Sequence, residues 1–266
     1  MRATLHHIDA FTTTPFGGNP AGVVVLPSWP DSEVLAAIAA ELNLSVTGFL
    51  VEARQDLELR LLTPTAEIGP AGHATMAAAY VALSELRPDA SLATFHLRGF
   101  EPLTAEREHG RIALNYPAMP GTPCDPPEAL LRGLSISPRD VLVAPFGYVA
   151  VVDDASTVLG LAPDMTELLR LDRGSAIVTA PGAECDFVSR VFSPKLGLPE
   201  DPVCGTAHRI MVPYWAERLK KSDLRAIQVS RRRGDFWCRD EEKRTVLAGN
   251  CAPLFKAELE IPDRVR

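Results

Sequence analysis

The feature that most constrains the fold is an internal repeat, in which three short segments recur in the same order about 130 residues later. The matched pairs are Pro15-Phe16-Gly17 with Pro145-Phe146-Gly147, Arg60-Leu61-Leu62-Thr63-Pro64 with Arg190-Val191-Phe192-Ser193-Pro194, and Ala71-Gly72-His73-Ala74 with Cys204-Gly205-Thr206-Ala207. Turns rich in proline and glycine are common between strands, so coincidence is the alternative explanation for any single pair. Three matches in order at a nearly constant offset favour a duplicated architecture.

Local patterns predict the elements of each half. Strands are expected over 4–11, 21–27, 47–53 and 57–63, with more within 92–115, and a helix from Asp31 or Ser32 to Asn43. A second helix, from Gly72 to Leu86, is apolar nearly all round, which is typical of a buried helix. We therefore predict an α+β fold of two pseudo-symmetric domains, each a curled, mainly antiparallel sheet around a central helix.

The boundary between the halves is expected in the proline-rich stretch 116–127. This gives domains of residues 1–117 and 118–266, and the final strand is a candidate to return to the first half. Pro213 lies inside the helical pattern of the second half, where a missing N–H group predicts a bend or an interruption.

Composition excludes several classes of function. The 266 residues are 46% hydrophobic and 23% charged, which is typical of a soluble globular protein. A net charge of −7 gives no electrostatic case for a nucleic-acid partner. The first residues lack the apolar core of a signal peptide and no apolar run approaches a membrane span, so we expect a cytoplasmic protein with no membrane partner. Five scattered cysteines without a C-x-x-C pair predict reduced thiols.

The candidate site lies where the two matched helices begin. Gly72 and Gly205 each start a helix, and a helix N-terminus offers unpaired N–H groups and the positive end of a dipole. Such ends suit a carboxylate, so the expected ligand is a small carboxylic acid. If the two helix starts face each other, the ligand belongs in a cleft between the halves.

Three side chains near these glycines can handle protons or donate hydrogen bonds. His73 has an ordinary pKa close to neutral, although a histidine at such a corner often serves only for capping or packing. Asp201 precedes Pro202, which keeps its backbone extended, and a turn-forming role is compatible with catalysis. Thr206 in the first helical turn can donate to a substrate or bond the backbone.

Cys204 adjoins the second helix start, where its pKa is expected to fall enough for acid or base chemistry. Its counterpart is Ala71, so a racemase mechanism with two thiols is unavailable at these positions. His208 fits a packing residue better than a ligand. The sequence has no dinucleotide fingerprint, Walker lysine, H-E-x-x-H or G-x-S-x-G, and nothing in it requires a metal or cofactor.

Together these motifs resemble the phenazine-biosynthesis PhzF-like isomerase family, with the diaminopimelate-epimerase-like fold. The matching segments run nearly end to end: Asp9-Ala10-Phe11, Gly18-Asn19-Pro20-Ala21-Gly22-Val23, Glu41-Leu42-Asn43-Leu44-Ser45, Thr63-Pro64-Thr65-Ala66-Glu67, Gly72-His73-Ala74-Thr75, the stretch Glu200 to His208, and Gln228-Val229-Ser230-Arg231. The resemblance implies a cofactor-free cleft between two similar domains, and commonly a homodimer. It also implies catalytic roles for His73 and Asp201, and substrate contacts from Asn19, Ser45, Val46, Gly72, Cys204, Gly205 and Thr206.

One position departs from the family pattern. The family's main proton shuttle is a Glu that follows Asn-Leu-Ser, and here that position is Val46. A placed general base contributes roughly 10²- to 10⁴-fold to a rate, and valine carries no proton. Three interpretations remain: an isomerase in which Asp201, His73, Cys204 or the substrate's own carboxylate moves the proton, a binding protein that keeps the site without turnover, or an engineered replacement.

The first interpretation is favoured because His73, Asp201 and Thr206 are all present. It predicts an isomerase for double-bond migration in a small unsaturated carboxylic or amino acid, as in antibiotic biosynthesis. A protein-interaction role for a dimer is the alternative from a different class. The substrate itself cannot be read from the sequence.

Overall fold

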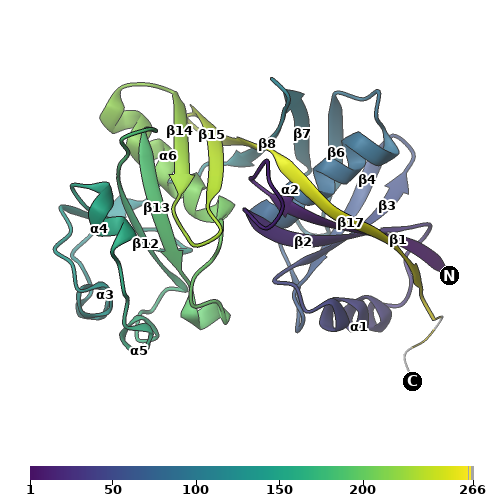
Figure 1. The fold of residues 1–266 in the computed structure, drawn as a ribbon, viewed down its shortest axis with the longest axis horizontal. Coiled ribbons are helices and arrows are strands. Elements are labelled where there is room, and N and C mark those ends of the chain that lie inside the picture. The colour runs from purple at the N-terminus through teal and green to yellow at the C-terminus, as the bar shows by residue number, and fades with distance from the viewer. Residues whose placement is uncertain (263, 265–266) are drawn as a thin grey trace. The chain divides into compact units, whose positions relative to one another are not determined.

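The computed structural model describes residues 1–262 and 264. The chain forms two compact units, unit 1 with Met1–Asn115 and Ala248–Arg266, and unit 2 with Tyr116–Leu247 (Figure 1). The final strand, β17 (Cys251–Glu260), therefore belongs to unit 1, where it pairs antiparallel with β1 (Arg2–Ala10) along its whole length.

Unit 1 is a mainly antiparallel sheet with a buried central helix. Its helices are α1 (Ser32–Leu42) and α2 (Gly72–Val81), the latter continued by a π-helical turn, Ala82–Leu86. Its other strands are β2 (Asn19–Leu26), β3 (Thr47–Ala53), β4 (Asp56–Leu62), β5 (Glu67–Ile68), β6 (Leu92–His96), β7 (Leu103–Glu108) and β8 (Arg111–Pro117), whose end passes into unit 2.

Helix α2 forms the centre of unit 1. Every residue from Gly72 to Val81 except Tyr80 is buried, because the helix packs against β1, β2, β3 and β17 (Figure 1). Its small alanines let the strands approach closely on all sides. The prediction of a buried helix wrapped by a sheet is confirmed.

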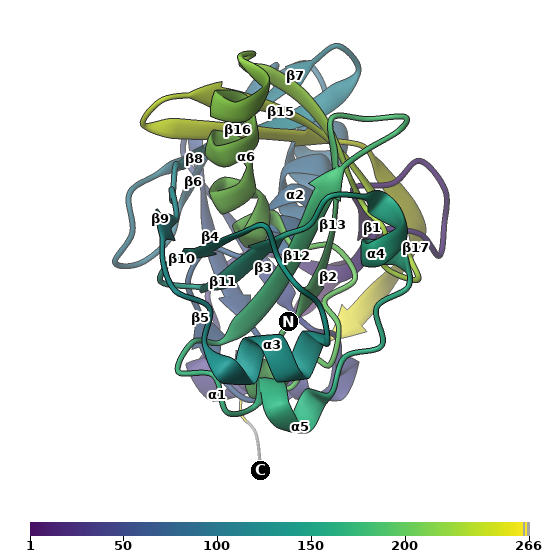
Figure 2. The same cartoon turned by 90° about the vertical axis from the view of Figure 1, so that its left-hand side faces the viewer.

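Unit 2 carries one long helix, α6 (Gly205–Leu219), and shorter ones at α3 (Glu128–Leu134), α4 (Ala155–Leu159) and α5 (Met165–Leu168), with a 3₁₀ turn at Pro194–Leu196. Its strands are β9 (Thr122–Pro123), β10 (Asp140–Val143), β11 (Gly147–Val151), β12 (Ser175–Pro181), β13 (Phe187–Phe192), β14 (Asp223–Gln228), β15 (Gly234–Glu241) and β16 (Arg244–Gly249). Helix α6 packs against β14 (Figure 1) and β15 (Figure 2).

Strand pairing gives the repeat a topological basis. In unit 1 the pairs β1–β2, β2–β3, β3–β4, β4–β6 and β6–β7 run antiparallel, parallel, antiparallel, parallel and antiparallel. In unit 2 the pairs β10–β11, β11–β12, β12–β13, β13–β14 and β14–β15 follow the same order of directions. The predicted α+β class, with mainly antiparallel sheets and a duplicated plan, is therefore correct.

Pro213 does not interrupt the helix, because α6 runs without a break from Gly205 to Leu219. Proline lacks the N–H group that would bond the carbonyl of Arg209, four residues earlier. That carbonyl instead accepts a hydrogen bond of 3.1 Å from the Met119 N–H. The freed acceptor thus fixes the segment that leads into unit 2.

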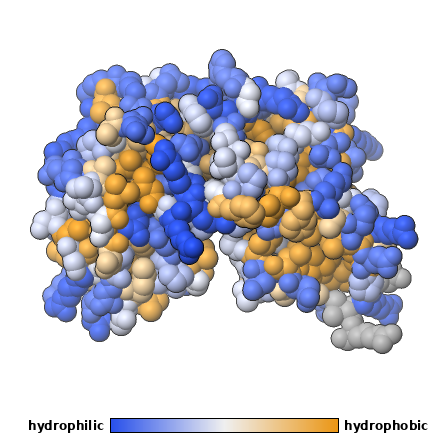
Figure 3. Space-filling model, viewed as in Figure 1, coloured by the Kyte–Doolittle hydropathy of each residue, from blue (hydrophilic) through white to orange (hydrophobic). Residues whose placement is uncertain are grey.

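No helix in the described part of the chain is long and apolar enough to cross a membrane. On the face shown in Figure 3, hydrophilic side chains cover much of the surface of each unit, with apolar areas between them. All five cysteines are free thiols, in agreement with the predicted reduced state.

Candidate active site

The predicted residues of unit 1 lie at the start of β2, in the bend before β3 and in the first turn of α2, and we call Asn19, Ser45, Val46, Gly72 and His73 half-site 1. Ser45 lies in the bend before β3, and its Oγ is 3.2 Å from Nε2 of His73 in the first turn of α2. The structure therefore brings these two predicted residues into one hydrogen-bonded pair.

Burial changes the chemistry expected of His73. The side chain is 8% exposed, and desolvation lowers its pKa to about 4. The prediction of proton exchange near neutral pH is therefore wrong, because burial penalises the charged imidazolium. At pH 7 the ring is neutral, and its Nε2 either donates a hydrogen bond to Ser45 or accepts one from it.

Val46 and Asn19 complete half-site 1. The Val46 side chain is 5% exposed and directly precedes β3, so it supplies apolar surface rather than a proton-transfer group. Asn19 is the buried first residue of β2 and pairs with Ala10 of β1. The turn before Asn19 is tight, because a Cβ on Gly18 would lie 2.0 Å from the Ala10 carbonyl oxygen.

The predicted residues of unit 2 gather at the start of α6, and we call Asp201, Cys204, Gly205 and Thr206 half-site 2. The Asp201 side chain folds back on its own turn, where Oδ1 accepts a hydrogen bond of 3.1 Å from the Val203 N–H. The Asp201 N–H bonds the Val191 carbonyl of β13 at 2.9 Å. Asp201 and Thr206 are half-buried, whereas Cys204 and Gly205 are buried.

Cys204 does not have the lowered pKa predicted from its position. Burial, reinforced by the neighbouring charge of Asp201, raises the pKa of the thiol well above its usual range. Desolvation outweighs the helix dipole and the backbone groups of Thr206 and Ala207, which favour the thiolate. Cys204 is therefore a protonated thiol that bonds Asp201 in half-site 2 rather than a thiolate base.

His208 is a packing residue, as predicted. It is fully buried and stacks on Phe236 with ring centroids 3.7 Å apart. Its Nδ1 donates a hydrogen bond of 2.8 Å to the Cys204 carbonyl. Burial lowers its pKa to about 4, so the ring supports the helix start as a neutral group.

The two helix starts have nearly the same local backbone. The residue before each helix is extended, with φ −114° and ψ 120° at Ala71 and φ −108° and ψ 100° at Cys204. In the described chain, neither of these two side chains caps its helix with a hydrogen bond. The first-turn N–H groups at Gly72 and Gly205 therefore lack the usual side-chain acceptor, which suits an anionic ligand.

Sequence reasoning missed two supporting interactions. Arg190 of β13 forms a two-pronged ion pair with Glu200, with Nε–Oε1 and Nη2–Oε2 distances of 2.7 and 3.1 Å, and this pair holds the residue before Asp201. Gln228, at the end of β14, bonds the backbone on both sides of the Asp201 turn. The repeat could have revealed the first, because Arg60 and Glu67 are matched residues in the first half.

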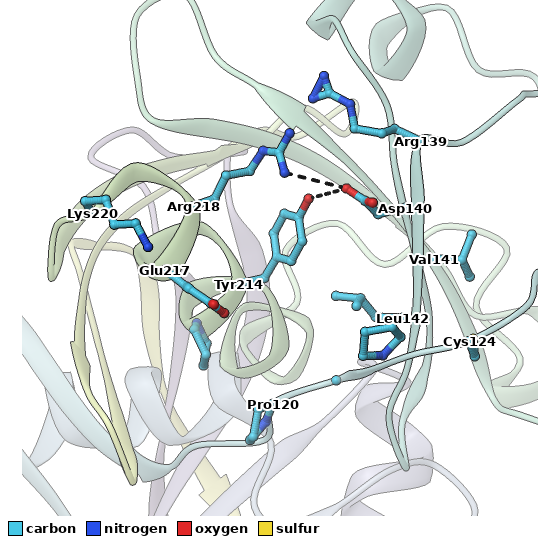
Figure 4. Close-up of a pocket in the computed structure, with 13 residues that line it drawn as sticks. Pro120, Cys124, Arg139, Asp140, Val141, Leu142, Tyr214, Glu217, Arg218 and Lys220 are labelled. Atoms are coloured by element: carbon cyan, nitrogen blue, oxygen red, sulfur yellow. Dashed lines mark hydrogen bonds and ion pairs between the residues drawn. The ribbon is translucent and has the colours of Figure 1, made fainter.

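A separate cavity of about 650 Å³ opens in unit 2 and contains none of the predicted site residues (Figure 4). Its polar groups bond one another: the Tyr214 hydroxyl donates to Asp140 at 2.7 Å, and Arg218 lies 3.7 Å from the same oxygen. Burial and the bond to Asp140 raise the pKa of Tyr214 to about 12. The geometry indicates a structural brace. In the part of the chain that the structure describes, no cluster of His, Cys, Asp or Glu could hold a metal ion.

Comparison with solved structures defines the class of fold. A hydroxyproline epimerase from Agrobacterium vitis, solved with bound trans-4-hydroxy-L-proline, matches with a TM-score of 0.60 at 11% identity, covering 97% of this chain and 92% of that one. A methylitaconate-delta-isomerase matches with a TM-score of 0.55 at 12% identity, covering 98% and 96%. At such low identity these matches show the fold alone, which is the predicted epimerase-like α+β fold.

Closer relatives give the family. Residues 8–257 match the phenazine biosynthesis-like protein family, PhzC-PhzF, and the chain belongs to that family. An uncharacterized isomerase of Pseudomonas aeruginosa is 41% identical, covering 98% of this chain and all of that protein. The crystal structure of a PhzF-family protein from Enterococcus faecalis matches with a TM-score of 0.94 at 35% identity, covering 98% of this chain and all of that one.

Proposed function

We propose that this protein is an isomerase that moves a proton, and with it a double bond, in a small unsaturated carboxylic or amino acid without a cofactor. The observation that carries the proposal is the Asp201 carboxylate, half-buried and oriented by the Val203 N–H directly before the start of α6. A carboxylate at such a place can take a proton from carbon and return it elsewhere. Secondary metabolism, such as antibiotic biosynthesis, is the proposed setting.

His73 and Ser45 serve this chemistry as neutral partners. With its pKa near 4, His73 is mostly uncharged at pH 7 and is a weak base. A neutral imidazole can still donate a hydrogen bond to a developing enolate oxygen, and Ser45 at 3.2 Å fixes the ring. Asp201 is thus the proposed proton carrier, and His73 the proposed stabiliser of negative charge.

The first-turn N–H groups of each helix, at Gly72 of α2 and at Gly205 of α6, are proposed as binding groups for a carboxylate, with Thr206 as a hydroxyl donor in unit 2. Val46, Cys204 and Asn19 are the other proposed substrate contacts. Val46 offers an apolar surface, and Cys204 offers a protonated thiol. A conjugated substrate fits these groups, because conjugation acidifies the migrating proton and a modest base suffices. A homodimer remains the proposed assembly.

Deuterium incorporation tests the proposal. The protein is incubated in deuterated water with 2,4-hexadienoate and with 1-pyrroline-2-carboxylate, and the products are read by NMR. Deuterium at a migrated carbon is expected with wild-type protein and not with Asp201→Asn or His73→Ala. Equal incorporation in wild type and Asp201→Asn would remove Asp201 from the mechanism.

A second candidate is a binding protein for small acids, and the buried Val46 is the observation that favours it. This candidate expects tight binding of the same acids, measured by calorimetry, without incorporation of deuterium. A pure interaction role for a dimer would give neither binding nor turnover. The three outcomes are distinct.

A further inference from the structure

We propose that Gln228 is a positioning residue that holds the Asp201 carboxylate in its working orientation, an inference that rests on the proposed function. Gln228 ends β14 and is fully buried. Its Nε2 donates a hydrogen bond of 2.6 Å to the Asp201 carbonyl, and its Oε1 accepts one of 2.8 Å from the Cys204 N–H. One side chain therefore bonds both ends of the turn that carries Asp201, and we call this pair of hydrogen bonds the Gln228 clip.

Neighbouring residues hold the same turn from the same side. Ser230 lies two residues after Gln228, and its hydroxyl donates a hydrogen bond to the Pro202 carbonyl. Val203 packs where Gly234 has no side chain, since a Cβ there would lie 2.4 Å from a Val203 methyl group. With the backbone fixed at these points, the Asp201 carboxylate bonds the Val203 N–H and the Cys204 thiol within the same turn.

The repeat shows that the clip accompanies the acid. Strand register pairs Leu57 with Phe95 in unit 1 and Phe187 with Ala226 in unit 2, so the counterpart of Gln228 is Leu97. Leu97 is a buried apolar side chain and cannot form either bond.

The acid is also missing from the first half. Glu67 matches Glu200 at the offset of the helix starts, so the counterpart of Asp201 is Ile68. Acid and clip are therefore present together in unit 2 and replaced together by apolar residues in unit 1. A clip needed only to build the fold would be expected in both halves, because the two share one topology.

Amide hydrogen exchange gives a test that does not depend on turnover. The Val203 amide reports the Asp201 carboxylate, because its N–H donates a hydrogen bond to Asp201 Oδ1. In Gln228→Leu we expect exchange at both Val203 and Cys204 to rise at least about tenfold. The matched control is Thr179→Val, which removes two buried hydrogen bonds, to the Val188 carbonyl and from Trp215, away from the turn.

A second variant keeps the test decisive if Gln228→Leu does not fold. Gln228→Glu retains the acceptor for the Cys204 N–H and loses the donor to the Asp201 carbonyl. We expect fast exchange at Val203 and continued protection at Cys204. The proposal would be overturned if the Val203 amide stayed protected in both Gln228 variants, or in the one that folds. It would also be overturned if Thr179→Val accelerated Val203 exchange equally.

Turnover then links the clip to chemistry. With 2,4-hexadienoate or 1-pyrroline-2-carboxylate in deuterated water, Gln228→Leu should lower kcat about 10- to 100-fold with KM within about threefold, while Thr179→Val keeps kcat within about twofold. Unchanged kcat despite fast Val203 exchange would overturn the positioning role. If wild-type protein incorporates no deuterium, the proposed function fails, and the exchange experiment still decides whether Gln228 orients Asp201.

Discussion

The two units follow one strand plan, yet their helix starts are supported by opposite kinds of contact. In unit 1 the turn before α2 is apolar: Gly69 packs so closely under the Phe100 ring that a Cβ would lie 2.5 Å from its Cζ. In unit 2 the turn before α6 is held by the Gln228 amide and the Ser230 hydroxyl. The strand plan is common to both halves, whereas the side-chain hydrogen bonds from Gln228 and Ser230 belong to unit 2.

The acid itself is the sharpest difference between the halves, and Asp201→Asn should have the largest effect. The amide keeps the size of the side chain and an oxygen for the Val203 N–H, but cannot carry the proton. We expect kcat to fall about 10²- to 10⁴-fold with little change in melting temperature. Ile68→Val, at the matched position, is the control and should leave kcat nearly unchanged.

A similarity between the halves predicts how stability depends on pH. His73 in unit 1 and His208 in unit 2 both have folded-state pKa values lowered to about 4 by burial, against an ordinary value of 6.5. Between these values the unfolded chain binds protons that the folded chain does not, so stability is full above pH 6.5 and is lost as pH falls toward 4.

Replacing either histidine should therefore flatten the curve. His73→Gln or His208→Gln is expected to reduce the loss of unfolding free energy between pH 7 and 4.5 by about 2–3 kcal/mol, measured by urea denaturation. The exposed His109 offers the control variant His109→Gln. An undiminished loss in both buried variants would assign the acid sensitivity to other groups.

The matched ion pairs differ in burial. Arg190 is 14% exposed and also bonds the carbonyls of Val158 and Leu161, whereas Arg60 and its partner Glu67 are 21% and 42% exposed. Arg190→Met should lower the unfolding free energy by about 2 kcal/mol, less than for a fully buried pair because solvent screens it, and Arg60→Met by less than about 1 kcal/mol. Equal losses in chemical denaturation would contradict the difference in burial.

The smallest effect concerns the matched Pro-Phe-Gly turns. Phe16 has φ +69° and is 71% exposed, whereas the φ angle of Phe146 is not positive. Phe16→Gly should stabilise unit 1 by about 0.5 kcal/mol, because relief of the left-handed backbone exceeds the entropy cost of glycine. Phe146→Gly should destabilise unit 2. Thermal unfolding of both variants checks the contrast in sign.

Sequence reasoning succeeded where the pattern is local or repeated. The 130-residue offset, the glycine-led helices and the alanine-rich core of α2 predict the duplicated α+β plan. These features depend on backbone propensity and hydrophobic period, which neighbouring residues specify.

Only the tertiary structure decided the properties that depend on desolvation and on contacts distant in sequence. The position of His73 predicts a pKa near neutral, and burial lowers that pKa to about 4. The position of Cys204 predicts a lowered pKa, and burial raises it instead. Pro213 left α6 continuous because Met119, 94 residues earlier, bonds the freed carbonyl. The Gln228 clip spans strands and a turn 24 to 27 residues apart, a distance at which no sequence period could indicate contact.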